Sequence, residues 1–244
     1  MKLKIISFWY NEAFLAPFFL KHYEPVQDIR IILDADTDDN TRAILMADPR
    51  VSFIEHRFKE GWNTQIKQDI LNREYQKAYD ADWVLMVDAD ELLVFEDFRH
   101  LHKTYHDVFV AMLYQVYRNA KDSDLDPGSS RVITQRRYGD PNMGDRFNAL
   151  YRKPIIVRGG LPVWWSPGCR FIKTRDEIHT SPIMIRGAHW AMADPCFCID
   201  RRLSRRYRIS NYNKQNGMSW HNWGVTREGL QEQCDAHLND PEVL

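Results

Sequence analysis

Three acidic side chains follow an apolar run near the middle of the sequence. Asp88, Asp90 and Glu91 stand directly after residues 83–87, with only Ala89 between the two aspartates. Carboxylates are costly to bury without partners, and three of them within four residues repel one another. We therefore expect positive charge beside them.

A divalent cation is one source of that charge. Residues two apart in an extended segment point the same way, so Asp88 and Asp90 can converge on one ion. Their oxygens suit Mg²⁺ or Mn²⁺, whose remaining positions would go to water and to phosphate oxygens of a substrate. The alternative is a strand-end turn with solvated acids, or acids that cap the next helix.

The elements around this cluster follow a regular alternation. Four short runs rich in β-branched and aromatic residues predict buried parallel strands: residues 3–9, 29–33, 51–55 and 83–87. Three segments with helical spacing lie between them: residues 12–22, 37–46 and 64–79. This order predicts a mostly parallel, doubly wound α/β sheet.

Polar residues gather where the predicted strands end. These ends carry WYNE (9–12), DADTDD (34–39) and DADE (88–91). Ligands of doubly wound sheets bind at the carboxyl ends of the strands. We therefore expect the functional site at this edge of the sheet.

Lys67 is a further candidate for that site. Asn63 or Thr64 can cap the helix expected at 64–79, which puts Lys67 near its first turn. The helix dipole disfavours a cation there unless an anion lies nearby. We therefore predict that Lys67 contacts a phosphate, with an exposed surface lysine as the alternative.

The second half of the chain is less regular. Strands are expected at residues 107–117, 149–160 and 185–190, a loop at 118–130, and helical spacing at 193–215 and 227–238. No linker or internal repeat is visible. We expect a single domain over residues 1–244.

Composition restricts the class of protein. The 244 residues are 44% hydrophobic, enough for a sizeable core, and the formal net charge of -1 gives no overall attraction to nucleic acid. No apolar run reaches the roughly 20 residues that span a bilayer. We expect a cytoplasmic chain with no transmembrane segment. The four cysteines suit free thiols, because their spacing fits neither a disulfide framework nor the common zinc sites.

Three motifs in this order resemble a family 2 glycosyltransferase with the GT-A fold. They are SFWYNEAFL (7–15), ILDADTDDNT (32–41) and DWVLMVDADELL (82–93). More narrowly, the chain resembles the bacterial subgroup with a DADE motif, often involved in surface polysaccharide or lipopolysaccharide assembly. The resemblance covers about residues 3–95 and implies a nucleotide-sugar-binding half, residues 1–106, and an irregular acceptor half, residues 107–244.

The resemblance also implies roles for single residues. Four would line the nucleotide: Phe8, Tyr10, Asn11 and Glu12. Asp34 would contact the base or ribose, Asp88 would lie by the ribose and metal, and Asp90 would ligate the metal. Many relatives have a second acid where this chain has Ala35, so the nucleotide stays open.

The implied activity is metal-dependent, inverting transfer of a sugar from a nucleoside-diphosphate sugar. The acceptor would be a glycan or a lipid-linked molecule, reached at the inner face of the membrane by peripheral contact. His189 resembles the late histidine that completes the metal site in many GT-A enzymes; a metal-binding imidazole must be neutral, as the free side chain is above about pH 6.5.

Other features of the second half leave alternatives open. The general base is unassigned among four acids: Asp145, Asp176, Glu177 and Asp194. Trp164 and Trp165 could stack on a sugar or pack in the core. The arginines of RRLSRRYR (201–208) could grip phosphates or form a solvated helix face.

Two rival functions use similar residues. A sugar-nucleotide transferase of related fold would need a Gly-rich basic loop after the first strand, which this chain lacks. A non-catalytic module that binds nucleotides or glycans would explain the aromatic residues but not Asp88 and Asp90. Turnover of a nucleotide sugar separates these options.

Overall fold

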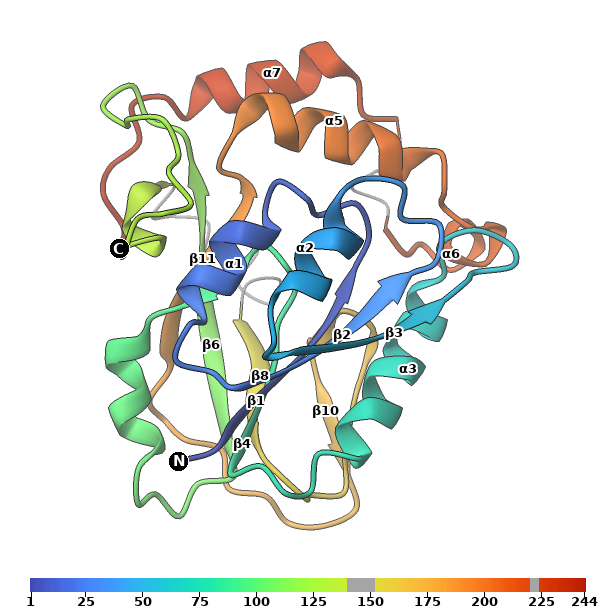
Figure 1. The fold of residues 1–244 in the computed structure, drawn as a ribbon, viewed down its shortest axis with the longest axis vertical. Helices are drawn as coiled ribbons and strands as arrows, with labels where there is room; N and C mark the ends of the chain where they lie inside the picture. Colours follow the sequence, from blue (N-terminus) through green and yellow to red (C-terminus); the bar gives the residue numbers. More distant parts are fainter. Residues whose placement is uncertain (140–151, 220–223) are drawn as a thin grey trace.

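A computed structural model describes residues 1–139, 152–219 and 224–244. One sheet of nine strands, so far as these residues show, joins both halves of the chain (Figure 1). Its order is β3–β2–β1–β4–β8–β6–β11–β5, with β7 beside β6. The strands are β1 (Leu3–Trp9), β2 (Asp28–Asp34), β3 (Val51–His56), β4 (Trp83–Met86), β5 (Glu91–Leu93), β6 (Val108–Tyr117), β7 (Tyr138–Gly139), β8 (Arg152–Arg158) and β11 (Ile185–Met192).

The direction of the strands confirms a mixed α/β fold with a mainly parallel sheet. β3, β2, β1 and β4 are parallel neighbours, and β6 and β11 point the same way. β8, β7 and β5 are antiparallel to them, and two of these three strands, β7 and β8, belong to the second half of the chain. β9 (Val163–Trp165) and β10 (Ile172–Thr174) form a separate hairpin.

The helices match the predicted segments with shorter bounds. They are α1 (Ala16–His22), α2 (Thr41–Ala47), α3 (Thr64–Gln76), α5 (Pro195–Arg206), α6 (Asn211–Gln215) and α7 (Arg227–Ala236), with 3-10 turns η1 (Phe95–Leu101), η2 (Ile133–Gln135) and η3 (Pro167–Cys169). The helix expected from residue 12 begins only at Ala16, after a turn at residues 13–15 and with Pro17 in its first turn. The helical region expected at 193–215 breaks at Ser210, which caps α6.

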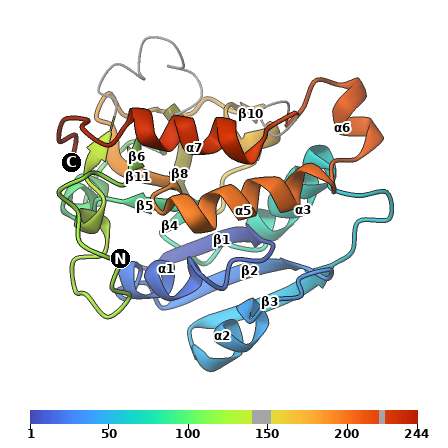
Figure 2. The same ribbon diagram turned by 90° about the horizontal axis from the view of Figure 1, so that it is seen from above.

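The winding of the sheet reverses between β1 and β4. From β1 the chain moves outward to β2 and β3, then crosses back to β4 on the other side of β1. Right-handed crossovers place the helices of the two directions on opposite faces, and Figure 2 shows α2 and α3 on opposite sides of these strands. The carboxyl ends of β1 and β4 therefore flank a topological switch point, where such folds bind ligands.

The core lies on both faces of the central strands. Ile5 and Ile6 of β1, Trp83 of β4 and Trp190 of β11 are almost fully buried. β3 is only half-buried because it is an edge strand, so the prediction of a buried strand is wrong for residues 51–55. None of the helices that the structure describes has the length and apolar content to cross a membrane.

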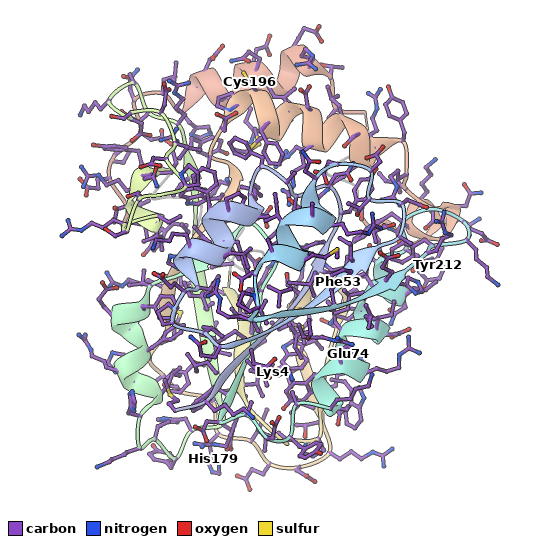
Figure 3. All side chains as sticks on the ribbon, in the orientation of Figure 1. Lys4, Phe53, Glu74, His179, Cys196 and Tyr212 are labelled. Atoms are coloured by element: carbon purple, nitrogen blue, oxygen red, sulfur yellow. The ribbon has the colours of Figure 1, made fainter. Side chains whose placement is uncertain are left out.

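The four cysteines are free thiols, as expected. Cys196 is exposed on α5, where Figure 3 labels it at the top of the view, and the other three are buried.

α5 lies over the end of the sheet where β1 terminates (Figure 1). It starts directly after β11, and its first turn is capped by Asp194, whose side chain accepts a hydrogen bond from the Phe197 backbone N–H. The Phe197 ring stacks on Phe14 with centroids 4.4 Å apart. This packing fixes the polar face of α5 above the strand ends.

Candidate functional site

A cavity of about 430 Å³ lies at the carboxyl ends of β1 and β4. Its walls come from the end of β1, the loop after β4, the start of α3, and α5 with the residues that follow it. The volume is in the range of small-molecule sites. A second cavity, about 540 Å³, lies between β3 and α3 and contains none of the strand-end acids.

Asp90 is held by an arginine from α5. Arg201 Nη1 donates to Asp90 Oδ2 at 2.6 Å, and Arg201 Nη2 donates to Glu12 Oε1 at 2.7 Å. Arg205 also donates to Glu12 Oε1. Burial alone would raise the pKa of Asp90, but the charge of Arg201 outweighs it and holds this pKa well below its usual range. We call Glu12, Asp90, Arg201 and Arg205 the arginine cluster.

Asp88 is held by two lysines instead. Lys67 Nζ donates to Asp88 Oδ1 at 2.7 Å, and Lys153 Nζ lies 3.8 Å from Asp88 Oδ2. Burial opposes ionisation, but these lysines lower the pKa of Asp88 to about 2. Lys153 also bonds Glu91, which is 1% exposed. The predicted positive charge is therefore present, and side chains supply it.

Lys67 occupies the position expected from the sequence. Asn63 caps α3 by accepting hydrogen bonds from the backbone N–H groups of Gln65 and Ile66. Lys67 follows in the first turn, its side chain is only 14% exposed, and its Nζ lies 5.6 Å from the centroid of the Trp62 ring. The alternative of an exposed surface lysine is wrong. The nearby anion that offsets the helix dipole is the carboxylate of Asp88.

Two of the predicted nucleotide-lining residues form an aromatic wall. Phe8 and Tyr10 line the cavity. The Phe8 ring meets Trp62 edge-on at 5.3 Å, and the guanidinium of Arg208 lies 3.7 Å from the centroid of the Tyr10 ring. Such surfaces suit the flat face of a base. Glu12 also lines the cavity, and its Oε1 accepts hydrogen bonds from Arg201 and Arg205.

Asn11 and Asp34 do not line the cavity. Asn11 exchanges hydrogen bonds with Asp38. Asp34 is fully buried, and Arg208 donates to its Oδ2 at 2.9 Å. The geometry therefore does not support direct contact of Asp34 with base or ribose, because its carboxylate is used to position Arg208.

His189 enters the cavity from β11 beside Asp90. Gln115 Nε2 donates to the backbone oxygen of His189, so its Oε1 accepts from His189 Nδ1 at 2.7 Å. This bond places the Nδ1 proton and turns Nε2 toward Asp90 Oδ2, 3.8 Å away. Burial and the nearby Lys153 lower the pKa of His189 to about 4. The imidazole is therefore neutral near pH 6.5, where a free histidine would titrate.

The predicted metal ligands do not converge on one point. Among the described residues, no three His, Cys, Asp or Glu side chains form a set that could hold an ion. Asp90 Oδ2 is hydrogen-bonded to Arg201 and Asp88 Oδ1 to Lys67. The set of Asp88, Asp90 and His189 therefore does not fit a divalent cation in this arrangement, and its metal role stays a prediction.

The candidate general bases that the structure describes do not line the cavity. Asp176 and Glu177 are exposed after β10, and Asp194 caps α5. Asp145 lies outside the described residues.

The tryptophan pair belongs to the hairpin and the core. Trp165 is buried and meets Tyr75 edge-on at 4.7 Å, whereas Trp164 is 43% exposed on β9. Neither lines the cavity.

The arginine run supplies residues whose role sequence reasoning left open. Arg201 and Arg205 are four positions apart on α5, the spacing that brings residues to one side of a helix, and Arg208 lies in the turn after the helix. All three reach the cavity, so a wholly solvated helix face is wrong. Lys153 and Gln115 were missed. Gln115 stands within an apolar strand, which is a local indication but does not identify its partner, and Lys153, between Arg152 and Pro154, gives no such indication.

Comparison with known proteins gives a fold likeness and no family. No family model matches the chain, and no curated protein matches it. Among solved structures it is similar to residues 1–349 of Staphylococcus aureus TarS, with 11% identity, a TM-score of 0.43, and coverage of 98% of this chain and 71% of that one.

Two further solved structures are similar over less of their length. A mycobacterial protein has 14% identity and a TM-score of 0.39, with coverage of 68% of this chain and 57% of that chain. A putative glucose-1-phosphate thymidylyltransferase from Bacillus anthracis has 14% identity and a TM-score of 0.29, with coverage of 51% and 61%.

Proposed function

We propose that this chain is a glycosyltransferase of the family 2, GT-A type that uses a nucleoside-diphosphate sugar. One observation carries the proposal: the cavity at the switch point of the sheet joins an aromatic wall to buried, fixed cations. An aromatic wall suits a nucleobase and fixed cations suit a diphosphate. A nucleotide sugar presents both groups in one molecule.

The donor would lie along the cavity with its base beside Phe8 and Tyr10. Its diphosphate would then face Lys67 in the first turn of α3 and Arg205 near the end of α5. Asp34 already holds the Arg208 guanidinium against the Tyr10 ring, at the side of the cavity where the base would lie.

The reaction would be a single displacement with inversion. The acceptor hydroxyl oxygen forms a bond to the anomeric carbon as the bond from that carbon to the diphosphate oxygen breaks. The hydroxyl proton goes to a base on the acceptor side, and the nucleoside diphosphate leaves with the electron pair. Cations held in fixed positions stabilise the negative charge that grows on this leaving group.

The acceptor would be a glycan or a lipid-linked molecule that approaches from the second half of the chain. His189 and Gln115, both on strands of that half, line the same cavity as the donor-side residues. Surface polysaccharide or lipopolysaccharide assembly is the setting that the motif resemblance suggests.

Thermal unfolding with a panel of nucleoside diphosphates tests the proposal. A ligand that binds only the folded chain, at about 100 times its Kd, adds about 2.7 kcal/mol to the free energy of unfolding. For a chain of this size the midpoint should rise by about 5–10 °C. At least one of UDP, GDP, CDP, ADP and dTDP should give this rise, with or without Mn²⁺. If none does, the proposal is wrong; turnover of the matching nucleotide sugar then separates a transferase from a binding module.

A further inference from the structure

The charges on the cavity wall do not balance. Among the described residues, two lysines and five arginines line the cavity against three carboxylates, and two of these cations also pair with the buried Glu91 and Asp34, which leaves an excess of two positive charges. The three carboxylates are Glu12, Asp88 and Asp90. A cavity that prefers a divalent cation needs an excess of negative groups, whereas this one attracts anions.

Each carboxylate already has cationic partners at hydrogen-bond distance. Arg201 lies 2.6 Å from Asp90 and 2.7 Å from Glu12, and Lys67 lies 2.7 Å from Asp88. A divalent ion would have to bind the second oxygens of these carboxylates and would then lie beside the charges of Lys67, Lys153 and Arg201. The carboxylates are therefore better explained as anchors that hold the cations in fixed positions.

Arg205 keeps donors that a ligand can reach, whereas the unused donor of Arg201 is a buried atom. Arg201 Nε is buried and has no hydrogen-bond partner among the described residues. The Arg205 side chain is 33% exposed, so part of its guanidinium reaches the cavity. An arginine fork matches the oxygens of a phosphate and binds two of them at once.

We infer that Arg205 and Lys67 bind the diphosphate directly, beside the charge of the buried Arg201, and that this binding needs no divalent cation. The inference rests on the proposed function. It assigns to cationic side chains the neutralisation of the leaving group that the sequence motif attributes to a metal. The DADE motif would then act by anchoring these side chains.

Calorimetric titration separates the two accounts. The nucleoside diphosphate that gives the largest thermal shift would be titrated into the full chain in EDTA and, separately, in Mn²⁺. We expect Kd values within about threefold of each other. A Kd more than about tenfold weaker in EDTA would overturn the inference while leaving the proposed function standing. Absence of binding in both buffers would overturn both.

A matched pair of variants on α5 tests the residues. Arg206 follows Arg205, but it donates to the backbone oxygen of Val225 and does not line the cavity. In EDTA, Arg205→Met should weaken nucleoside diphosphate binding at least about tenfold and nucleoside binding little, since only the former carries the phosphates. Arg206→Met should change neither. Equal Kd values for the two variants would contradict a phosphate contact by Arg205. If Arg205→Met does not fold, the comparison of EDTA with Mn²⁺ on the unaltered chain still tests the inference.

Discussion

Arg201 explains how two acids of the first half can be buried in this fold. Its guanidinium joins Glu12 and Asp90, and all three side chains are less than a tenth exposed. Removal of one partner from a buried ion pair leaves an uncompensated charge, which costs more than the pair itself contributes.

Arg201→Met should therefore lower the free energy of unfolding by about 3–5 kcal/mol, measured by urea denaturation. The triple variant with Glu12→Gln and Asp90→Asn should recover part of this loss, because it no longer buries unpaired charges. A loss below about 1 kcal/mol in the single variant would mean that the cluster is solvated.

Lys67 lines the cavity and bonds Asp88, and in the proposed complex its ammonium group would also contact the diphosphate. A charge-assisted contact exists with nucleoside diphosphate and not with nucleoside. Lys67→Met should therefore weaken diphosphate binding at least about tenfold and leave nucleoside binding nearly unchanged, in calorimetric titrations. Lys77, which follows α3 and pairs with Glu74, supplies the control as Lys77→Met. Equal weakening of both ligands would refute the phosphate contact.

His22 gives the fold a dependence on pH. It lies at the end of α1, where its Nε2 donates to the backbone oxygen of Leu93, and burial lowers its pKa to about 4. Between pH 6.5 and about 4 the unfolded chain protonates this imidazole while the folded chain keeps it neutral. The free energy of unfolding should therefore fall as the pH falls, by on the order of 3 kcal/mol from this group.

The variant His22→Gln should fall less steeply over that range than the wild type. Part of the remaining fall belongs to His189, whose pKa is also lowered to about 4. His179, which Figure 3 places at the end of the molecule away from α5, is the control as His179→Gln. The role assigned to His22 fails if its variant and the wild type have the same pH profile.

At the scale of elements, α5 decides which side chains reach the strand ends. Its start is fixed by the Asp194 cap and by Phe197 on Phe14, and Arg201 and Arg205 follow at one-turn spacing. Asp194 is also a candidate general base, and the Asp194→Asn variant separates that role from its role as the helix cap.

As a cap, Asp194→Asn should keep both stability and transfer, because asparagine caps a helix about as well as aspartate. Asp194→Ala should cost about 1 kcal/mol of unfolding free energy in chemical denaturation. As a base, Asp194→Asn should abolish sugar transfer with stability intact, and that result would contradict the role that the geometry gives it.

The sheet could be predicted from the sequence because its determinants are local. Alternating apolar runs and helical spacing located β1, β2, β4, β6 and β11, and the polar strand ends located the cavity. Asn63 as the cap of α3 also follows from spacing alone.

The pairings inside the site could not be predicted in this way. Arg201 and Asp90 are 111 positions apart, and Gln115 and His189 are 74 apart. Spacing within one element says nothing about which distant side chain completes a charge. The acids at Asp88 and Asp90 indicate that a cation lies beside them, but the sequence does not identify it. A metal ion and distant basic side chains satisfy the same local pattern.

At the scale of the whole molecule, the central claim is that the cavity between the ends of β1 and β4 binds a nucleotide-sugar donor. A crystal structure of the chain with the nucleoside diphosphate that most raises its unfolding midpoint tests this directly. We predict the base against Phe8 and Tyr10, and phosphate oxygens about 3 Å from Lys67 Nζ and the Arg205 guanidinium. Nucleotide bound elsewhere, or with its phosphates turned away from α3 and α5, would contradict the account.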